Sequence, residues 1–344
     1  MERIVALLGG FIIGWVLDNI SMPIPFMLGG IFSALLMKMV VRMEVDWPKS
    51  WRNLGLVIIG YGIGRRITPN IVEQALGQIP GIVGVTVLAV LIAIAISVFM
   101  ARTQKVDLQS VIMGIMPGGF TQMTAMSDED IRADQNIVAV LQSLRLVTIV
   151  ITVPFLVKQV LHAHTVGTVE SLAVHDAVSF WYILPGCILA GLFMEKIKSS
   201  TPYLMGPIII AGIAAVHFGM INTVPSLLMD VAQLSVGLYV GLGLDPKRIK
   251  ELKKIMPATF LGIFAMLFAS IGVAFLLSSA YHFSLITAFL AMSPGGLGEM
   301  CLVGMSLGEN VSIILTYQMF RFLFLNLAVP YGIYKYFGPA VPRK

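Results

Sequence analysis

The sequence matches itself when it is shifted by 177 residues. Under this shift Pro117-Gly118-Gly119 falls on Pro294-Gly295-Gly296, and Met123 falls on Met300. The other matches are also mostly glycine and proline: Pro25 with Pro202, Gly29 with Gly206, Gly60 with Gly237, Gly64 with Gly241, Pro69 with Pro246 and Pro80 with Pro257. These two residue types fix the path of the backbone more than side-chain chemistry. Both halves of the chain are therefore predicted to follow one backbone path.

Both halves are strongly apolar. Apolar residues make up 57% of the 344 residues and charged residues only 12%, whereas a soluble domain contains about 25% charged residues. Windows such as 79–100 and 258–279 are nearly free of charge and are long enough to cross the hydrocarbon core of a bilayer. We therefore expect an all-α integral membrane protein with many spans.

Each half contains six apolar segments, and the fifth carries the Pro-Gly-Gly motif. They lie at roughly 3–20, 24–41, 51–66, 79–101, 107–132 and 136–160, and again at 179–196, 202–218, 225–244, 257–280, 284–308 and 311–336. Since Pro-Gly-Gly breaks a helix, the fifth segment either crosses as a broken helix or enters the membrane and turns back. Segment 51–66 is the weakest span because it is short and rich in glycine.

The distribution of lysine and arginine favours fifth segments that turn back. If they crossed, 11 basic residues would lie inside the cell and 10 outside, which is no bias. If they are re-entrant, 18 of the 23 basic residues lie inside, Arg65, Arg66 and Lys158 lie outside, and the other two lie within spans. This bias is the one that the positive-inside rule describes. The prediction is a first repeat at 1–161, an external connector at 162–178 and a second repeat at 179–344. Each repeat has five spans, the second is inverted, and both termini are cytoplasmic.

Inverted repeats would bring the two Pro-Gly-Gly breaks to the middle of the bilayer from opposite faces. Backbone outside a helix is tolerated there only where it lines a cavity or is buried in protein. Its free N–H and C=O groups can bind ions, helped by the helix ends. This arrangement is typical of a secondary transporter with its site between the breaks. The candidate substrate-binding residues at the breaks are Gly118, Gly119, Thr121, Gln122, Gly295 and Gly296.

Two arginines lie at equivalent places within the last span of each half. Arg145 and Arg321 each follow a glutamine, Gln142 and Gln318, by three residues. An arginine at this depth costs at least about 2.5 kcal/mol unless it faces a partner or a cavity. One interpretation is that the guanidinium groups hold a carboxylate or another anion, with the glutamines binding the same ligand. The alternative is structural: each arginine binds carbonyl groups of a re-entrant tip, and the glutamines face another helix.

Glu299 is the carboxylate nearest to the second break, where the first repeat has Gln122. A carboxylate within the membrane is a functional candidate by default. Glu299 could carry a coupling proton or, together with Ser293, bind Na⁺. The alternative is that Glu299 neutralises Arg321 or Arg145.

The remaining polar clusters carry weaker signals. The acidic residues at 128–130 and 134 are interpreted as a solvated helix end, with an ion vestibule as the alternative. The connector residues His162, His164, His175 and Asp176 match no metal-binding spacing, so we expect neither a metal site nor a cofactor. Cys187 and Cys301 lie in apolar segments and are expected to be buried and unpaired. The net charge of +5 comes from short loops that set topology, so no nucleic-acid partner is expected.

The stretches PFMLGG at 25–30 and PYLMGP at 202–207, with the two P-G-G-x-x-x-M turns, resemble the AbrB-type membrane proteins of bacteria over nearly the whole chain. Their architecture is similar to that of bile-acid, arsenite and citrate-type secondary transporters. The resemblance implies a multi-pass protein of the bacterial cytoplasmic (inner) membrane with elevator-type alternating access. It also implies a mobile core domain and a panel domain that often dimerises, so a homodimer is left open.

Labels within that family conflict. Some members are called ammonia monooxygenases, but this sequence has no metal-ligand cluster within its spans and no redox cofactor motif, so we do not expect an enzyme. The expected function is secondary transport of a small, anionic metabolite, an organic acid or an amino acid, coupled to H⁺ or Na⁺. The alternative is a membrane sensor or regulator of gene expression that has a transporter-like fold and acts through a partner. The expected contacts are a small-molecule substrate and membrane lipid.

Overall fold

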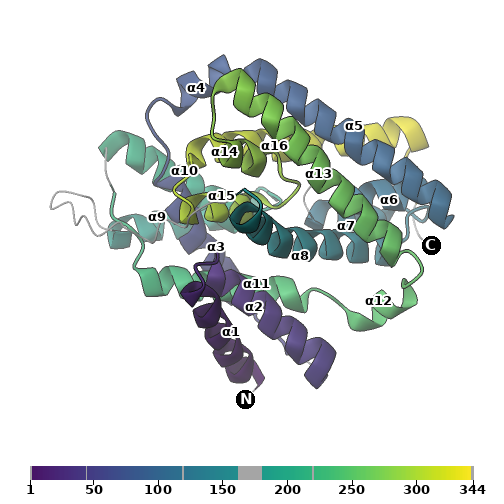
Figure 1. The fold of residues 1–344 in the computed structure, drawn as a ribbon, viewed down its shortest axis with the longest axis horizontal. Helices are drawn as coiled ribbons and strands as arrows, with labels where there is room; N and C mark the ends of the chain where they lie inside the picture. Colours follow the sequence, from purple (N-terminus) through teal and green to yellow (C-terminus); the bar gives the residue numbers. More distant parts are fainter. Residues whose placement is uncertain (1, 44, 118–119, 162–179, 219–220, 342–344) are drawn as a thin grey trace. The chain divides into compact units, whose positions relative to one another are not determined.

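The computed structural model describes residues 2–43, 45–117, 120–161, 180–218 and 221–341. These residues form helices and no strand, which confirms the all-α prediction (Figure 1). In the first half the helices are α1 (Glu2–Asn19), α2 (Pro25–Leu35), the π-helical turn η1 (Leu36–Val41), α3 (Lys49–Gly64), α4 (Ile71–Gly77), α5 (Ile79–Gln104), α6 (Leu108–Ile115), α7 (Phe120–Glu129) and α8 (Gln135–Gln159). In the second half they are α9 (Phe180–Lys196), α10 (Pro202–Phe218), α11 (Ser226–Leu242), α12 (Pro246–Glu251), α13 (Met256–Tyr281), α14 (Leu285–Met292), α15 (Leu297–Ser306) and α16 (Val311–Phe337).

Four of these helices are long and apolar enough to cross a bilayer: α5, α8, α13 and α16. Shorter apolar helices occupy Pro25–Val41, Pro202–Phe218, Ser226–Leu242 and Leu297–Ser306. The hydrocarbon core of a bilayer offers no hydrogen-bond partner to backbone N–H and C=O groups. A helix is stable there because its backbone hydrogen bonds are made within the helix. The helices and their composition support a membrane protein.

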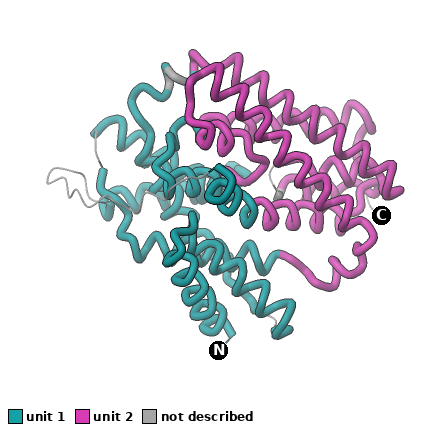
Figure 2. Tube along the Cα trace, viewed as in Figure 1, with its two compact units in different colours: residues 1–75, 150–243, 298–314 teal, residues 76–149, 244–297, 315–344 magenta. Residues whose placement is uncertain are grey.

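Two compact units make up the chain (Figure 2). Unit 1 consists of residues 1–75, 150–243 and 298–314, and unit 2 of residues 76–149, 244–297 and 315–344. Each unit takes segments from both predicted repeats. The duplication is therefore distributed over both units.

Unit 1 contains reciprocal contacts between the repeats. A Cβ atom at Gly60 on α3 would lie 2.7 Å from the carbonyl oxygen of Leu204 on α10, and one at Gly237 on α11 would meet the carbonyl oxygen of Met27 on α2. Gly60 and Gly237 are equivalent under the 177-residue shift, and so are Met27 and Leu204. Reciprocal contacts of this kind define two-fold symmetry. In unit 1, equivalent residues of the two repeats therefore exchange equivalent contacts.

Helices α3 and α11, which are equivalent in the two repeats, run antiparallel. Gly55 lies against Ala232, while Gly62, further along α3, lies against Met229, which comes earlier in α11. The hydroxyl of Tyr61 also donates to the carbonyl of Asn222, just before α11, at 2.7 Å. The glycines permit this close approach because a side chain at their positions would meet backbone or side-chain atoms of α11 within 3 Å.

Unit 2 repeats this arrangement with longer helices. A Cβ at Gly262 on α13 would lie 2.9 Å from the sulfur of Met100 near the end of α5, and one at Gly81 near the start of α5 would lie 2.6 Å from the ring of Tyr281 at the end of α13. Helices α5 and α13 therefore also run antiparallel, and Figure 1 shows them side by side. Around them a core forms from buried methionine and aliphatic side chains, among them Met113, Ile115, Met123, Leu141 and Leu325.

The fifth apolar segments begin in the same way in both repeats. Asp107 accepts a hydrogen bond from the backbone N–H of Ser110 at 2.6 Å, and Ser284 accepts one from Thr287 at 3.0 Å. Each is an N-cap that satisfies a backbone donor left over at the helix start. Asp107 and Ser284 are equivalent under the shift, so the duplicated path extends to the caps of α6 and α14.

Candidate functional site

Both fifth segments break at the Pro-Gly-Gly motif. Helix α6 ends at Ile115 and α7 begins at Phe120, while α14 ends at Met292 and α15 begins at Leu297. Pro117 and Pro294 lie in the interruptions. The candidates Gly118 and Gly119 lie outside the described residues, as does the side chain of Thr121.

Arg321 on α16 binds the end of α14. Its Nη1 donates to the carbonyl of Met292 at 2.9 Å, and its Nη2 donates to Ser293 at 2.7 Å and to Gly295 at 3.5 Å. Gln318, one turn earlier, donates to the carbonyls of Leu290 at 2.7 Å and Ser293 at 3.1 Å. The Gln318 Oε1 accepts a further hydrogen bond from Arg321. The pair is deeply buried, with 4% of Arg321 exposed.

Arg145 on α8 binds the end of α6 in the same way. It donates to the carbonyl of Ile115 at 3.0 Å and to that of Met116. Gln142 donates to the carbonyls of Met113 at 2.5 Å and Met116 at 3.2 Å, and its Oε1 accepts from Arg145 at 3.0 Å. We call each pair, Gln142 with Arg145 and Gln318 with Arg321, a Gln–Arg clamp.

The clamps bind groups that a broken helix leaves without partners. The last carbonyls of a helix have no intrahelical donor and carry the negative end of the helix dipole. A guanidinium with five N–H groups satisfies several of them at once and matches their charge. In this conformation both arginines make the contacts of the structural alternative, and contact of the arginines with substrate stays a prediction.

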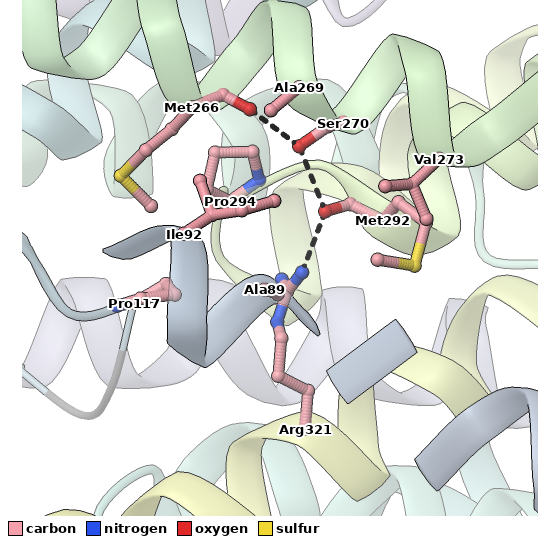
Figure 3. Close-up of a pocket in the computed structure, with 10 residues that line it drawn as sticks. All are labelled: Ala89, Ile92, Pro117, Met266, Ala269, Ser270, Val273, Met292, Pro294 and Arg321. Atoms are coloured by element: carbon pink, nitrogen blue, oxygen red, sulfur yellow. Dashed lines mark hydrogen bonds between the residues drawn. The ribbon is translucent and has the colours of Figure 1, made fainter. Parts of the chain in front are cut away.

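The breaks contribute to one cavity, which lies entirely within unit 2 (Figure 3). Pro117 from the first break and Pro294 from the second line it, together with Arg321. On α13, Ser270 donates to the carbonyl of Met266 at 2.8 Å and lies 3.4 Å from that of Met292. The cavity offers about 20 Å³ to the centre of a water molecule, which is room for one or two waters.

Neither clamp has an acidic partner among the described residues. The ion pairs that unit 2 shows there are Arg132 with Asp130 and Arg248 with Asp245. Both guanidinium groups are buried, and their hydrogen-bond partners among the described residues are carbonyl groups and the amide oxygen of a glutamine. A buried cation without a counter-ion is costly, so this unit favours an anion near the breaks.

The other candidate residues have separate environments. Gln122 on α7 donates to the carbonyl of Asn326 at 2.9 Å, and its Oε1 has no partner among the described residues. Ser293 is fully buried, and its hydroxyl also lacks a partner there. Gly295 accepts from Arg321, and Gly296 lies in the same interruption. Glu299 lies in the first turn of α15 and belongs to unit 1, whereas both arginines belong to unit 2.

A polar network that the sequence reasoning missed joins α6, the α7–α8 loop and the chain after α16. Asp130 is only 3% exposed, and it pairs with Arg132 at 2.6 Å and accepts from Gln109 at 2.9 Å. Arg132 also donates to the carbonyls of Phe337 and, at 2.8 Å, Pro339. The interpretation of Asp130 as a solvated helix end is wrong because these partners bury it. The Arg132 guanidinium holds the pKa of Asp130 well below its usual range.

Within the described part of the chain, no three His, Cys, Asp or Glu residues lie close enough to hold a metal ion. The connector residues His162, His164, His175 and Asp176 lie outside that part. Cys187 and Cys301 are buried free cysteines.

Comparison with known sequences identifies relatives along most of the chain. The sequence model of the family described as "Transition state regulatory protein AbrB" matches residues 26–337. "Uncharacterized protein YhjN" of Bacillus subtilis (strain 168) is 25% identical over 344 residues, which covers 92% of this chain and 88% of the relative. "Putative regulator AbrB" of Escherichia coli (strain K12) is 23% identical over 329 residues, or 94% and 93% of the two chains. The resemblance stated from the sequence motifs is confirmed.

Proposed function

This chain belongs to the AbrB family, and for this member we propose secondary transport of a small anionic metabolite, an organic acid or an amino acid, coupled to H⁺ or Na⁺. The observation that carries the proposal is the pair of Gln–Arg clamps at two broken helices that contribute to one cavity. Broken helices within a membrane are stable only where they are buried in protein or line a cavity, and secondary transporters use them to bind substrates. The unpaired charges of Arg145 and Arg321 supply the attraction for an anion.

We further propose that the repeats are inverted in the membrane and that their fifth segments are re-entrant. The antiparallel contacts of α3 with α11 and of α5 with α13 support this. A two-fold axis that relates two antiparallel helices is perpendicular to both of them. If these helices cross the bilayer, that axis lies in the membrane plane, which is the symmetry of inverted repeats.

The proposed mechanism is elevator-type alternating access. Unit 2 contains both breaks, both clamps and the cavity, so we propose it as the body that carries substrate. Unit 1 is the proposed panel, and it would also provide the surface of a homodimer. The proposed location is the bacterial cytoplasmic membrane, with the connector 162–178 outside and both termini in the cytoplasm.

Coupling is assigned to Glu299 of unit 1, and Ser293 of unit 2 is a candidate ligand if the coupling ion is Na⁺. Glu299 lies directly after the second break, in the first turn of α15. The hydroxyl of Ser293 is fully buried and has no hydrogen-bond partner among the described residues. This supports its inclusion, because a buried polar atom without a hydrogen bond is costly. The proposed activity requires no cofactor and no nucleic acid.

A second candidate function is regulation. It is favoured by the description of the family, "Transition state regulatory protein AbrB", and by the name of the Escherichia coli relative, "Putative regulator AbrB". In this reading the chain senses a ligand through the transporter-like fold and acts on gene expression through a partner protein.

The test is flux into proteoliposomes that contain the purified protein. Radiolabelled organic acids and amino acids are offered with an imposed Na⁺ gradient, an imposed pH gradient or neither. Protein-dependent accumulation driven by one gradient supports transport. Saturable ligand binding without flux under any gradient would reject transport and favour the regulatory candidate.

A further inference from the structure

The two Gln–Arg clamps are not equivalent, although the sequence repeats them. Arg321 lines the cavity at the breaks and Arg145 does not. The hydrogen bonds of Arg321 use Nη1 and Nη2, so its Nε–H donates to no described residue. Of the two arginines, Arg321 is thus the one that has both a free N–H group and adjoining space.

Among the described residues that line the cavity, the other side chains are apolar apart from one hydroxyl. Alanine, isoleucine and valine side chains surround it on α5 and α13, among them Ala89, Ile92, Ala269 and Val273. The exception is Ser270 on α13, whose hydroxyl donates to nearby carbonyls and can turn toward a ligand (Figure 3). The wall therefore offers one cation, one hydroxyl and an apolar surface.

We infer that this cavity receives the carboxylate of a small aliphatic monocarboxylate, with Arg321 and Ser270 donating to its oxygens. The inference rests on the proposed function and deepens it by naming the substrate class. The space for one or two waters suits a carboxylate head, and the alanine, isoleucine and valine side chains contact a short alkyl tail.

The same wall excludes two other classes of organic anion. The ammonium group of an amino acid would lie beside Arg321 with no carboxylate to accept from it, since the residues that line the cavity include none. The second carboxylate of a dicarboxylate would have no second cation, because Arg145 is not part of the lining. An unpaired charge in an apolar site is strongly disfavoured, so we expect both classes to be rejected.

The first test is ligand specificity of the unmodified protein in chloride-free medium. Thermal stability is measured against acetate, propionate, glycine, succinate and chloride. We expect saturable stabilisation by acetate and propionate, with glycine and succinate at least about tenfold weaker because each leaves a charged group unpaired. Equal or tighter binding of glycine or succinate would overturn the inference. The inference would also be overturned if chloride stabilised the protein fully and acetate gave no further stabilisation.

Two variants on α13 test the location. Ala269→Leu fills the cavity and is expected to abolish the response to propionate. Its matched control is Gly272→Leu on the same helix, where an added Cβ meets nothing within 4 Å, and this variant should keep the response. If Ala269→Leu does not fold, Ser270→Ala takes its place and should weaken acetate binding several-fold. Unchanged propionate binding in a folded Ala269→Leu variant, or unchanged acetate binding in Ser270→Ala, would overturn the placement.

Failure of this inference and failure of the proposed function give different results. Flux of a dicarboxylate or an amino acid without acetate binding would leave transport standing and reject the monocarboxylate assignment. Acetate binding that depends on Ser270, without flux, would keep the assignment and reject transport.

Discussion

Gly55 and Ala232, which occupy equivalent positions in the two repeats, lie against each other. A Cβ atom at Gly55 would be 2.9 Å from the carbonyl oxygen of Ala232. A residue that contacts its own counterpart lies where the two repeats meet. The close packing of α3 on α11 therefore depends on small residues at the point where the repeats meet.

The first prediction concerns this packing. Gly60→Ala should lower the free energy of unfolding by about 1–3 kcal/mol, because the new methyl group would lie 2.7 Å from the carbonyl oxygen of Leu204. Gly272→Ala, in open space on α13, should be neutral or stabilise the helix by up to about 1 kcal/mol. Thermal unfolding in detergent measures both. Equal melting temperatures for the two variants would contradict the packing argument.

The second prediction separates the two clamps. Arg321→Gln and Arg145→Gln should each destabilise the ligand-free protein by about 1–3 kcal/mol, since each leaves helix-end carbonyls without donors. Anion binding should be weaker in Arg321→Gln than in Arg145→Gln, because Arg321 lines the cavity and Arg145 does not. Calorimetric unfolding and ligand titration give the two readouts. An equal loss of binding in both variants would show that the clamps contribute alike.

The third prediction assigns coupling. Glu299→Gln removes the carboxyl group in the first turn of α15 and should abolish the dependence of uptake on the pH or Na⁺ gradient. Anion exchange between equal solutions should persist, because the clamps are unchanged. Flux is measured with an imposed gradient and between equal solutions. Gradient-driven uptake that persists in Glu299→Gln would exclude Glu299 from coupling.

The fourth prediction tests membrane topology. The basic helix α12 (Pro246–Glu251) is expected to face the cytoplasm, so Lys250→Cys should resist an impermeant thiol reagent until the cells are opened. The buried Cys187 and Cys301 are replaced by alanine first, to remove background labelling. Labelling of intact cells from outside would overturn the ten-span arrangement.

The fifth prediction concerns pH. Arg132 lowers the pKa of Asp130 in the folded protein relative to the unfolded value near 4. The stabilisation is thus fully present above about pH 5 and is lost as the pH falls toward the lowered pKa. Asp130→Asn should reduce stability at neutral pH by about 1–2 kcal/mol and flatten its decline in acid. Thermal unfolding at a series of pH values measures the stability of both proteins. A parallel loss of stability in acid for the two proteins would contradict the role of this pair.

Much of the helical framework follows from local sequence. The twelve expected apolar segments fall on helices, and both Pro-Gly-Gly motifs interrupt one. These features depend on hydropathy and on the restricted backbone of proline and glycine, which act over a few residues. Arg145 and Arg321 also stand out in the sequence, since a charge within an apolar segment needs a partner.

The sequence by itself thus determined the helices, their breaks, the duplication and the identity of the buried polar residues. Only the tertiary structure decided what those residues bind. Arg145 and Arg321 bind carbonyl groups about 30 residues away, and Asp130 is buried by Arg132 and Gln109 rather than solvated. The inequivalence of the clamps likewise depends on which side chains from α5 and α13 enclose the cavity. In each case the partners lie far apart in the sequence. Hydropathy and helix-breaking residues act locally, so no short stretch of the chain specifies which distant groups come together.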